Sequence, residues 1–163
     1  MQVDAKGPGI SRNHLKIIKV VDGDGLWVED IFTKTQEEIR LPCIDAPEIK
    51  RCRKLIQDER ETHLPEQLLI EPGLQSWQYL RGLAQIGVSV SIRTESNYST
   101  DPYGRTLAYV FLPDGSCLNE KMIEDGFAKP YNKYYCNSIA EYQRLNFLAK
   151  IAGKGLYFRV TDF

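Results

Sequence analysis

Residues of the kinds that bind metal ions and phosphate recur at short intervals in this sequence. An Asp-Gly-Asp turn at residues 22–24 is followed by Arg40 and then by an Asp-Ala-Pro-Glu segment at residues 45–48. An Asp-Pro-Tyr-Gly-Arg segment at residues 101–105 places a second arginine in a predicted tight turn. Hard cations such as calcium bind carboxylate and carbonyl oxygens, and guanidinium groups bind phosphate through paired N–H donors. The pattern therefore predicts a calcium-dependent phosphodiesterase site.

The acidic residues divide into metal ligands and a residue that acts on water. Asp24 and Asp45 each offer a carboxylate to a cation, and the backbone carbonyl of Ala46 offers a third oxygen. Glu48 lies three residues beyond Asp45, where a carboxylate can position a metal-bound water or take its proton.

The two arginines complete the predicted chemistry. An attacked phosphodiester gains negative charge on its equatorial oxygens, and Arg40 and Arg105 are the candidates to stabilise that charge. Removing one such stabilising group typically slows an enzyme by about 10²–10³-fold. Most arginines in proteins form surface ion pairs instead, so their spacing alone leaves both interpretations open.

Length and composition indicate a single globular domain. The chain has 163 residues, a net charge of −1 and 42% hydrophobic residues, so any attraction to phosphate must be local. No segment approaches the roughly 20 apolar residues of a membrane span, and residues 1–12 contain no signal-peptide core. We expect a flexible arm at residues 1–13, a single domain at residues 14–163, a monomer, and no membrane partner; the sequence leaves the compartment undecided.

Four scattered cysteines do not form a metal-binding pattern. No C-x-x-C pair is present, and the two histidines stand alone, so zinc binding is poorly supported. A disulfide between two of the cysteines stays open, but small buried apolar side chains are the favoured interpretation. The cysteines are Cys43, Cys52, Cys117 and Cys136.

Hydrophobic patterns predict the elements that must position these residues. Alternating or β-branched runs favour five strands, at residues 15–21, 26–31, 36–45, 88–93 and 105–112, the third interrupted by Pro42. Three helices are expected: one opened by Pro72 and ended at Gly87, a short one around residues 118–125, and one from a Ser138/Glu141 capping box to Gly153. This order predicts a β-barrel with helices, a five-stranded OB-fold barrel plus three α-helices.

Five motifs, taken in order along the chain, resemble the staphylococcal nuclease (thermonuclease-like) family. They are Val21-Asp22-Gly23-Asp24, Arg40-Leu41, Ile44-Asp45-Ala46-Pro47-Glu48, Tyr103-Gly104-Arg105 and Gly126-Phe127-Ala128-Lys129. The resemblance extends from about residue 15 to about residue 158. It implies an OB-fold barrel with three helices and calcium-dependent hydrolysis of DNA and RNA, with 5′ P–O cleavage that leaves 3′-phosphates.

The resemblance also implies roles for individual residues. Asp24, Asp45 and the Ala46 carbonyl would bind calcium, with Asp22 supporting the metal site from outside the ligand shell. Glu48 would act on the water, and Arg40 and Arg105 would bind and stabilise the phosphate. The residues expected to contact substrate are Tyr103, Tyr131, Asp101 and Lys129.

The sequence departs from the family pattern at three places. Gly25 stands where a threonine usually supports the metal shell, and Pro42-Cys43 replaces a small or aliphatic residue followed by Gly or Val. Simple strand alternation would point Arg40 and Asp45 to opposite faces, so a bulge or kink near Pro42 is predicted. An extended loop at about residues 49–71 opens with a basic run at residues 50–54, which would guide a phosphate backbone or form a solvated charged surface.

Two other identities are weighed against the calcium-dependent nuclease. Glu48-Ile49-Lys50 downstream of Asp24 also satisfies the loose pattern of magnesium-dependent restriction-type nucleases, whose fold needs a central sheet flanked by helices. A non-catalytic OB-fold module that only binds nucleic acid is the other alternative, for which Gly25 is the main argument. A protein-interaction domain with coincidental motifs is weaker still.

Overall fold

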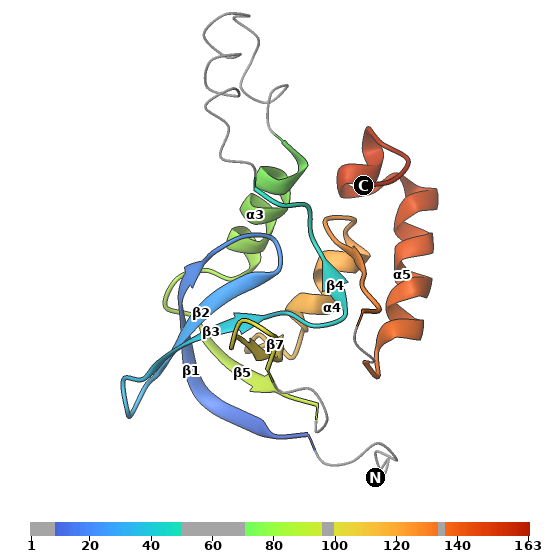
Figure 1. Cartoon of the computed structure of the whole chain (residues 1–163). Coiled ribbons are helices and arrows are strands. Elements are labelled where there is room, and N and C mark those ends of the chain that lie inside the picture. Colours follow the sequence, from blue (N-terminus) through green and yellow to red (C-terminus); the bar gives the residue numbers. More distant parts are fainter. Residues whose placement is uncertain (1–8, 50–70, 96–99, 134–135) are drawn as a thin grey trace, which may run out of the picture.

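In its described residues, the computed structural model contains a strongly curled six-stranded sheet, a small two-stranded sheet and three α-helices (Figure 1). It describes residues 9–49, 71–95, 100–133 and 136–163. The sheet has the strand order β6-β3-β2-β1-β5-β7, in which only the β3–β6 pair is parallel. Its strands are β1 (Ser11–Val20), β2 (Gly25–Asp30), β3 (Gln36–Arg40), β5 (Ser89–Arg93), β6 (Thr106–Leu107) and β7 (Tyr109–Phe111).

The two edges of this sheet are consecutive pieces of the chain. β6 pairs with β3 and β7 pairs with β5, yet Ala108 alone separates them in sequence. The sheet must therefore curl until its edges meet, as in a small barrel. If β6 and β7 are counted as one broken strand, the barrel has the five predicted strands, and the predicted fold class is confirmed.

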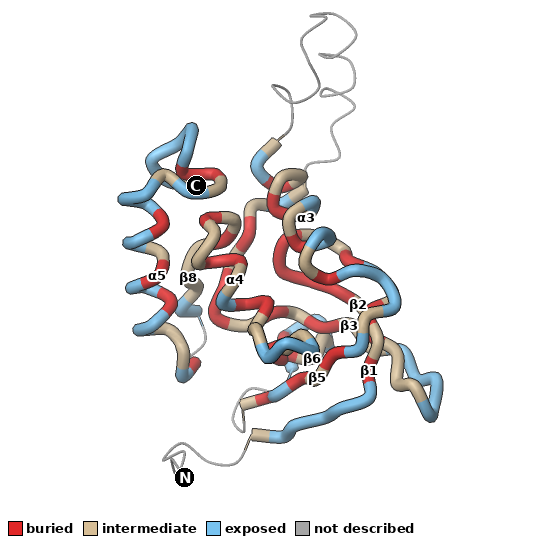
Figure 2. Tube along the Cα trace, turned by 180° about the vertical axis from the view of Figure 1, so that it is seen from behind, coloured by how far each residue is buried: buried red, intermediate tan, exposed pale blue. Residues whose placement is uncertain are grey.

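Helices cover one side of the barrel and enclose the core with it. They are α3 (Pro72–Leu83), α4 (Leu118–Glu124), α5 (Ile139–Ala152) and the short 3₁₀ helix η1 (Gly155–Phe158). Seen from behind, α4 is mostly buried or half-buried, whereas α5 alternates buried and exposed residues on the outside (Figure 2). Strand residues such as Ile17, Val28 and Ile39 and the α4 residues Met122 and Ile123 are completely buried. The apolar faces of barrel and helices thus supply most of the stabilising burial.

A second, two-stranded sheet lies between the barrel and α5. β4 (Ile44–Asp45) pairs with β8 (Lys129–Pro130), antiparallel. The predicted strand at residues 36–45 is therefore two strands in different sheets. The chain turns between them at Pro42 and Cys43, and Cys43 has a φ of +67°, which confirms the kink predicted near Pro42.

Several boundaries differ from the sequence prediction. β1 begins at Ser11, inside the predicted arm, because polar residues there pair with β5 across the sheet. β8 and η1 were not predicted, since two to four residues carry no periodic signal. α5 ends at Ala152, and Gly153 stops it as predicted, in a left-handed conformation; Ser138 forms no side-chain cap, and Glu141 pairs with Arg144 instead. Residues 1–8 of the arm and residues 50–70 of the extended loop lie outside the described residues.

The favoured interpretation of the cysteines is wrong for two of them. The structure joins Cys43 and Cys136 by a disulfide. Their sequence separation of 93 gave no spacing signal, because only the fold brings the turn after β3 next to the segment before α5. Cys117 is a half-buried free thiol whose pKa is raised by burial, and Cys52 lies outside the described residues.

No helix in the described parts of the chain has the length and apolar character needed to cross a bilayer.

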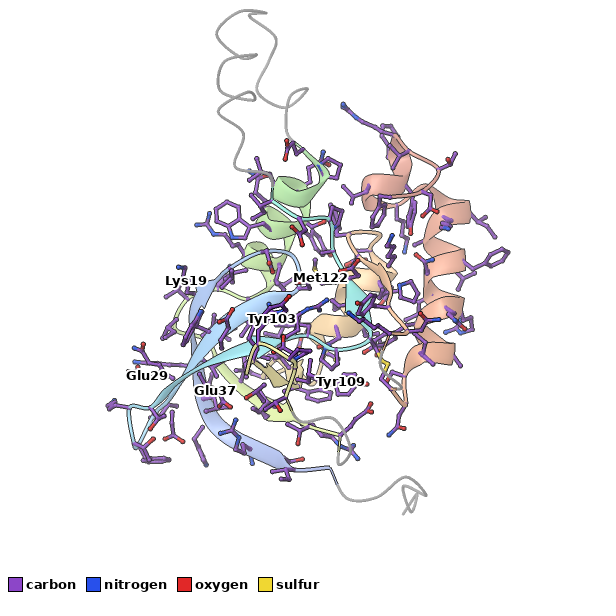
Figure 3. All side chains as sticks on the ribbon, in the orientation of Figure 1. Lys19, Glu29, Glu37, Tyr103, Tyr109 and Met122 are labelled. Carbon is purple, nitrogen blue, oxygen red and sulfur yellow. A yellow bond between two sulfur atoms is a disulfide. The ribbon has the colours of Figure 1, made fainter. Side chains whose placement is uncertain are left out.

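The hairpin of β2 and β3 carries acidic side chains, among them Glu29 and Glu37, on the side of the molecule away from α5 (Figure 3). Tyr103 lies between that hairpin and α5, on the side of the barrel where the predicted site residues gather.

Candidate active site

The turn between β1 and β2 packs directly against the segment that follows β4. A Cβ added to Gly23 would lie 2.6 Å from the Ala46 Cβ and 2.7 Å from the Ser76 Cβ, so only glycine permits this approach. The Leu41 N–H also donates to the Asp24 carbonyl at 2.8 Å. These contacts bring the 22–24 turn beside the second acidic segment, although about twenty residues separate them in the chain.

Asp24 is buried at the centre of this contact, with 7% of its surface exposed. Its Oδ2 accepts a hydrogen bond from the Ala46 N–H at 3.0 Å, and its own N–H donates to Asp22 Oδ1 at 3.1 Å. Burial raises the pKa of Asp24 to about 7, and the nearby Asp22 carboxylate adds to the rise, whereas Arg40 opposes it. A buried carboxylate of this kind is stabilised in its charged form by a cation.

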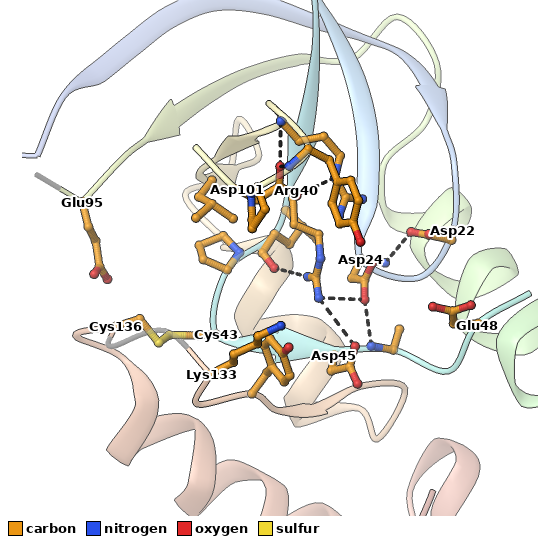
Figure 4. A pocket seen from close by; sticks show the side chains of 18 residues that line it. Asp22, Asp24, Arg40, Cys43, Asp45, Glu48, Glu95, Asp101, Lys133 and Cys136 are labelled. Atoms are coloured by element: carbon orange, nitrogen blue, oxygen red, sulfur yellow. Dashed lines mark hydrogen bonds and ion pairs between the residues drawn. A yellow bond between two sulfur atoms is a disulfide. The ribbon is translucent and has the colours of Figure 1, made fainter. Parts of the chain in front are cut away.

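Arg40, the last residue of β3, supplies a cation at this point. Its Nη2 lies 3.3 Å from Asp24 Oδ2 and 3.5 Å from Asp45 Oδ1. Its Nη1 donates to the backbone carbonyls of Leu41 at 2.5 Å and Ile44 at 3.0 Å. The guanidinium is therefore held rigidly by the turn that its own strand enters (Figure 4).

Arg105 is held by the turn that contains it. Asp101 Oδ1 accepts the N–H groups of Tyr103 at 3.0 Å and Arg105 at 2.8 Å, and Asp101 Oδ2 accepts Arg105 Nε at 2.7 Å. Burial works against the Asp101 charge, but the hydrogen bonds from Arg105 outweigh it and hold the pKa of Asp101 below its usual value. Because the ion pair uses Nε, the two Nη groups of Arg105 keep their N–H donors, with no partner among the described residues.

Glu48 is exposed at the edge of the same cleft. The start of α3 packs on its backbone: a Cβ added to Gly73 would lie 2.1 Å from the Glu48 carbonyl oxygen. The backbone of Glu48 is thus fixed by a close contact that only glycine allows, while its carboxylate stays accessible to water.

These side chains line one cleft of about 300 Å³. Two tyrosines lie beside its arginines: the Tyr131 ring centroid is 5.9 Å from the Arg40 guanidinium carbon, and that of Tyr103 is 5.8 Å from Arg105. Tyr103 is 85% exposed, so one face of its ring is free to stack on a planar ligand. The cleft brings together every predicted site residue except Lys129.

Lys129 is placed elsewhere. Its ammonium donates to the backbone carbonyl of Phe163 at 2.6 Å, and its backbone pairs with Asp45 in the small sheet. Lys129 therefore lies outside the lining of the cleft, and its contact with substrate, which rested on a motif, stays a prediction.

Sequence reasoning missed other groups that line the cleft. Lys133 is an exposed cation that lines the cleft. It lies only two residues beyond Tyr131, and this nearness in sequence to a predicted substrate contact was the signal that could have identified it. Glu95 accepts the Tyr109 hydroxyl at 2.5 Å and the Asn137 N–H at 2.9 Å. The Cys43–Cys136 disulfide also lines the cleft. Glu95 and the disulfide gave no local signal, because their partners are distant in sequence.

The carboxylates of Asp24 and Asp45 are the kind of ligand that a hard cation prefers. Oxygens of Asp24 and Asp45 both lie within 3.5 Å of one positively charged nitrogen, so the two carboxylates already converge on a cation. Calcium prefers such oxygens and completes its shell with carbonyls and waters. Among the described residues, no three acidic, histidine or cysteine side chains are grouped closely enough to bind a metal by themselves. Metal binding would therefore depend on the Ala46 carbonyl and water in addition to the two carboxylates.

Gly25 leaves the Asp22 carboxylate close to the start of β2. A Cβ added at Gly25 would lie 3.0 Å from Asp22 Oδ1, tighter than ordinary contact. A threonine here, as in the family pattern, would require Asp22 to shift. Gly25 thus lacks the threonine hydroxyl of the family pattern, and the Asp22 carboxylate lies close to where the threonine side chain would begin.

Comparison with known proteins gives concordant matches. The model of the family described as staphylococcal nuclease homologue matches residues 38–159. Endonuclease YhcR of Bacillus subtilis is 26% identical over 136 residues, which cover 83% of this chain and 10% of that protein. An uncharacterized endonuclease of Escherichia coli O157:H7 is 30% identical over 121 residues, which cover 74% of this chain and 63% of that protein. The chain thus spans less than two thirds of the length of these relatives.

Proposed function

Because the chain belongs to the staphylococcal nuclease homologue family, we propose that it is a calcium-dependent endonuclease that hydrolyses DNA and RNA. The observation that carries the proposal is the convergence of Asp24 and Asp45 on one Arg40 nitrogen, in a cleft that Glu48 and Arg105 also line. Two carboxylates, two guanidinium groups and an accessible third carboxylate can together bind a cation, stabilise a charged phosphate and act on a water, which are the tasks of phosphodiester hydrolysis. The endonuclease names of two relatives support the same reaction class.

The two arginines would bind the scissile phosphate from different sides. Arg40 comes from the end of β3 and Arg105 from the turn before β6, and each is fixed by hydrogen bonds to protein oxygens. Fixed donors stabilise developing charge without the cost of reorganisation. Tyr103 and Tyr131, next to these arginines, would contact the flanking nucleotides by stacking or by hydrogen bonds to phosphate.

Asp24, Asp45 and the Ala46 carbonyl would hold calcium, with Asp22 supporting Asp24 by accepting its backbone N–H on Oδ1. Bound calcium would neutralise phosphate charge and increase the acidity of a nearby water. Glu48 would orient that water for attack on phosphorus, and it is also placed to act as the general base that accepts the proton of the water. The bond to the 5′ oxygen then breaks, the leaving oxygen takes a proton from solvent, and the phosphate remains on the 3′ end.

The curled barrel argues against the restriction-type alternative, because that fold needs a central sheet with helices on both faces. A binding-only module would lack the catalytic acids, whereas Asp24, Asp45 and Glu48 all line this cleft.

The test is cleavage of an end-labelled single-stranded DNA and a matching RNA with calcium, magnesium or EDTA. We expect cleavage with calcium only, with products bearing 3′-phosphates. Cleavage only with magnesium, leaving 5′-phosphates, would contradict the proposal in favour of the restriction-type reaction. Binding without cleavage in either metal would identify a nucleic-acid-binding module. Glu120→Gln, an exposed acid on α4, is the matched control for changes of Glu48.

A further inference from the structure

The turn from Leu41 to Ile44, which we call the Arg40 cradle, receives a hydrogen bond on each of its carbonyls. Arg40 Nη1 donates to the carbonyls of Leu41 and Ile44. The Tyr131 N–H donates to the Cys43 carbonyl at 2.8 Å. The completely buried Asn119 donates its Nδ2–H to the Pro42 carbonyl at 3.0 Å. The path of the cradle thus decides where the guanidinium of Arg40 points.

The cradle depends on an unfavourable backbone conformation. Cys43 has a φ of +67°, in the left-handed region that favours glycine. A residue with a Cβ stays there only when its surroundings hold it. The Tyr131 hydrogen bond and the disulfide to Cys136 both restrain Cys43, whose Sγ also lies 3.4 Å from the Tyr109 hydroxyl oxygen.

The disulfide connects the cradle to the far wall of the cleft. Cys136 precedes α5, its exposed fraction is 3%, and both cysteines line the cleft. Asp45 follows the cradle directly in β4, and β4 pairs with β8, which leads to Tyr131. One covalent bond therefore joins the segment carrying Arg40 and Asp45 to the segment that follows Tyr131.

We propose that the Cys43–Cys136 disulfide is a positioning element of the active site. It holds Cys43 in its left-handed conformation and thereby keeps the cradle carbonyls on Arg40 and the Asp45 carboxylate in the cleft. This role rests on the proposed nuclease function. Without the cross-link, Cys43 relaxes toward ordinary φ values, the carbonyls of the cradle rotate, and Arg40 loses the acceptors that aim it.

The first experiment compares the oxidised protein with Cys136→Ser, after peptide mapping without reductant has identified the 43–136 cross-link. Hydrogen exchange is followed in peptides covering residues 40–46 and 129–131. We expect these peptides to exchange at least about tenfold faster in the variant, and kcat to fall about 10–100-fold, since small misplacements of catalytic groups have effects of this size. Cys117→Ser, the same change at a free thiol, should stay within about twofold of the parent protein.

Three further variants distinguish a general loss of stability from a loss of position at the active site. A disulfide that closes a 93-residue loop also stabilises the fold, so Val28→Ala, a completely buried position in the sheet, serves as a destabilised control. The second variant combines Cys136→Ser with Cys43→Gly. Glycine adopts positive φ without a penalty, so this double variant should recover most of the lost kcat, whereas Cys136→Ser with Cys43→Ala should not.

Unchanged exchange at residues 40–46 in Cys136→Ser would overturn the proposal, as would an equal loss of kcat in Val28→Ala or the absence of a 43–136 cross-link. The exchange measurement needs no catalysis. If the oxidised protein cleaves nothing with any metal, the proposed function fails, while exchange at the cradle still decides whether the disulfide positions it.

Discussion

Asp101 offers the sharpest test of how the cleft positions an arginine. Its side chain is only 4% exposed and binds Arg105 Nε at 2.7 Å. In Asp101→Asn, the remaining carbonyl oxygen still accepts the backbone N–H groups of the turn, but an NH₂ group replaces the acceptor that faces Nε. One charge-assisted hydrogen bond is lost, which costs about 1.5–3 kcal/mol. For a chain of this size, that loss lowers Tm by roughly 3–12 °C.

The effect on catalysis should pass entirely through Arg105. Arg105→Ala should lower kcat about 10²–10³-fold, and Asp101→Asn, which leaves the arginine present but loosely held, about 10–100-fold. In the Arg105→Ala background, Asp101→Asn should change kcat less than about twofold. If the reductions of kcat caused by the two substitutions multiply in the double variant, the reasoning is refuted. Asp101 would then contact substrate directly, as the sequence motif suggested.

A control and a pH dependence sharpen the result. Glu141→Gln removes the carboxylate of the exposed Arg144 pair on α5, at 2.6 Å, and should leave both the stability and kcat essentially unchanged, because solvent screens an exposed ion pair. The pKa of Asp101 is lower in the folded protein than in the unfolded chain, so its ionisation stabilises the fold above a pH of about 4. The stability difference between the parent protein and Asp101→Asn should shrink as the pH falls below that value and through the lower pKa of Asp101 in the folded protein, and a constant difference would contradict the assigned cause.

Three further predictions follow from the contacts of single residues. Glu48→Gln should lower kcat at least about 10²-fold with calcium affinity by titration calorimetry and Tm unchanged, because Glu48 is exposed; full activity would remove it from the mechanism. Asn119→Ala should destabilise by about 1–3 kcal/mol in urea unfolding, since it leaves the Pro42 carbonyl and the Val110 N–H unpaired, and no loss would show that water replaces it. Lys129→Ala should leave KM for DNA within about twofold while lowering Tm, because its ammonium binds the Phe163 carbonyl; a raised KM would restore it as a substrate contact.

The sequence determined the class of fold and most of the residues that meet in the cleft. Apolar alternation and glycine or proline punctuation are local signals, so they located the strands and helices. The same local logic predicted the kink at Pro42, since Arg40 and Asp45 could not otherwise reach one site. The broken strand at Ala108 escaped prediction, because nothing in residues 105–112 shows that its halves pair with different partners.

Only the tertiary structure decided how the site residues are held. Arg40 binds carbonyls of its own turn and two carboxylates, Arg105 is anchored by Asp101, and Lys129 binds the Phe163 carbonyl. The Cys43–Cys136 disulfide likewise joins residues far apart in sequence. Each contact depends on the packing of segments against one another, and a linear pattern carries no information on that packing beyond the residue types it must accommodate. The sequence thus determined which groups are available for chemistry, and the packed barrel decided their distances and directions, because those arise from long-range contacts.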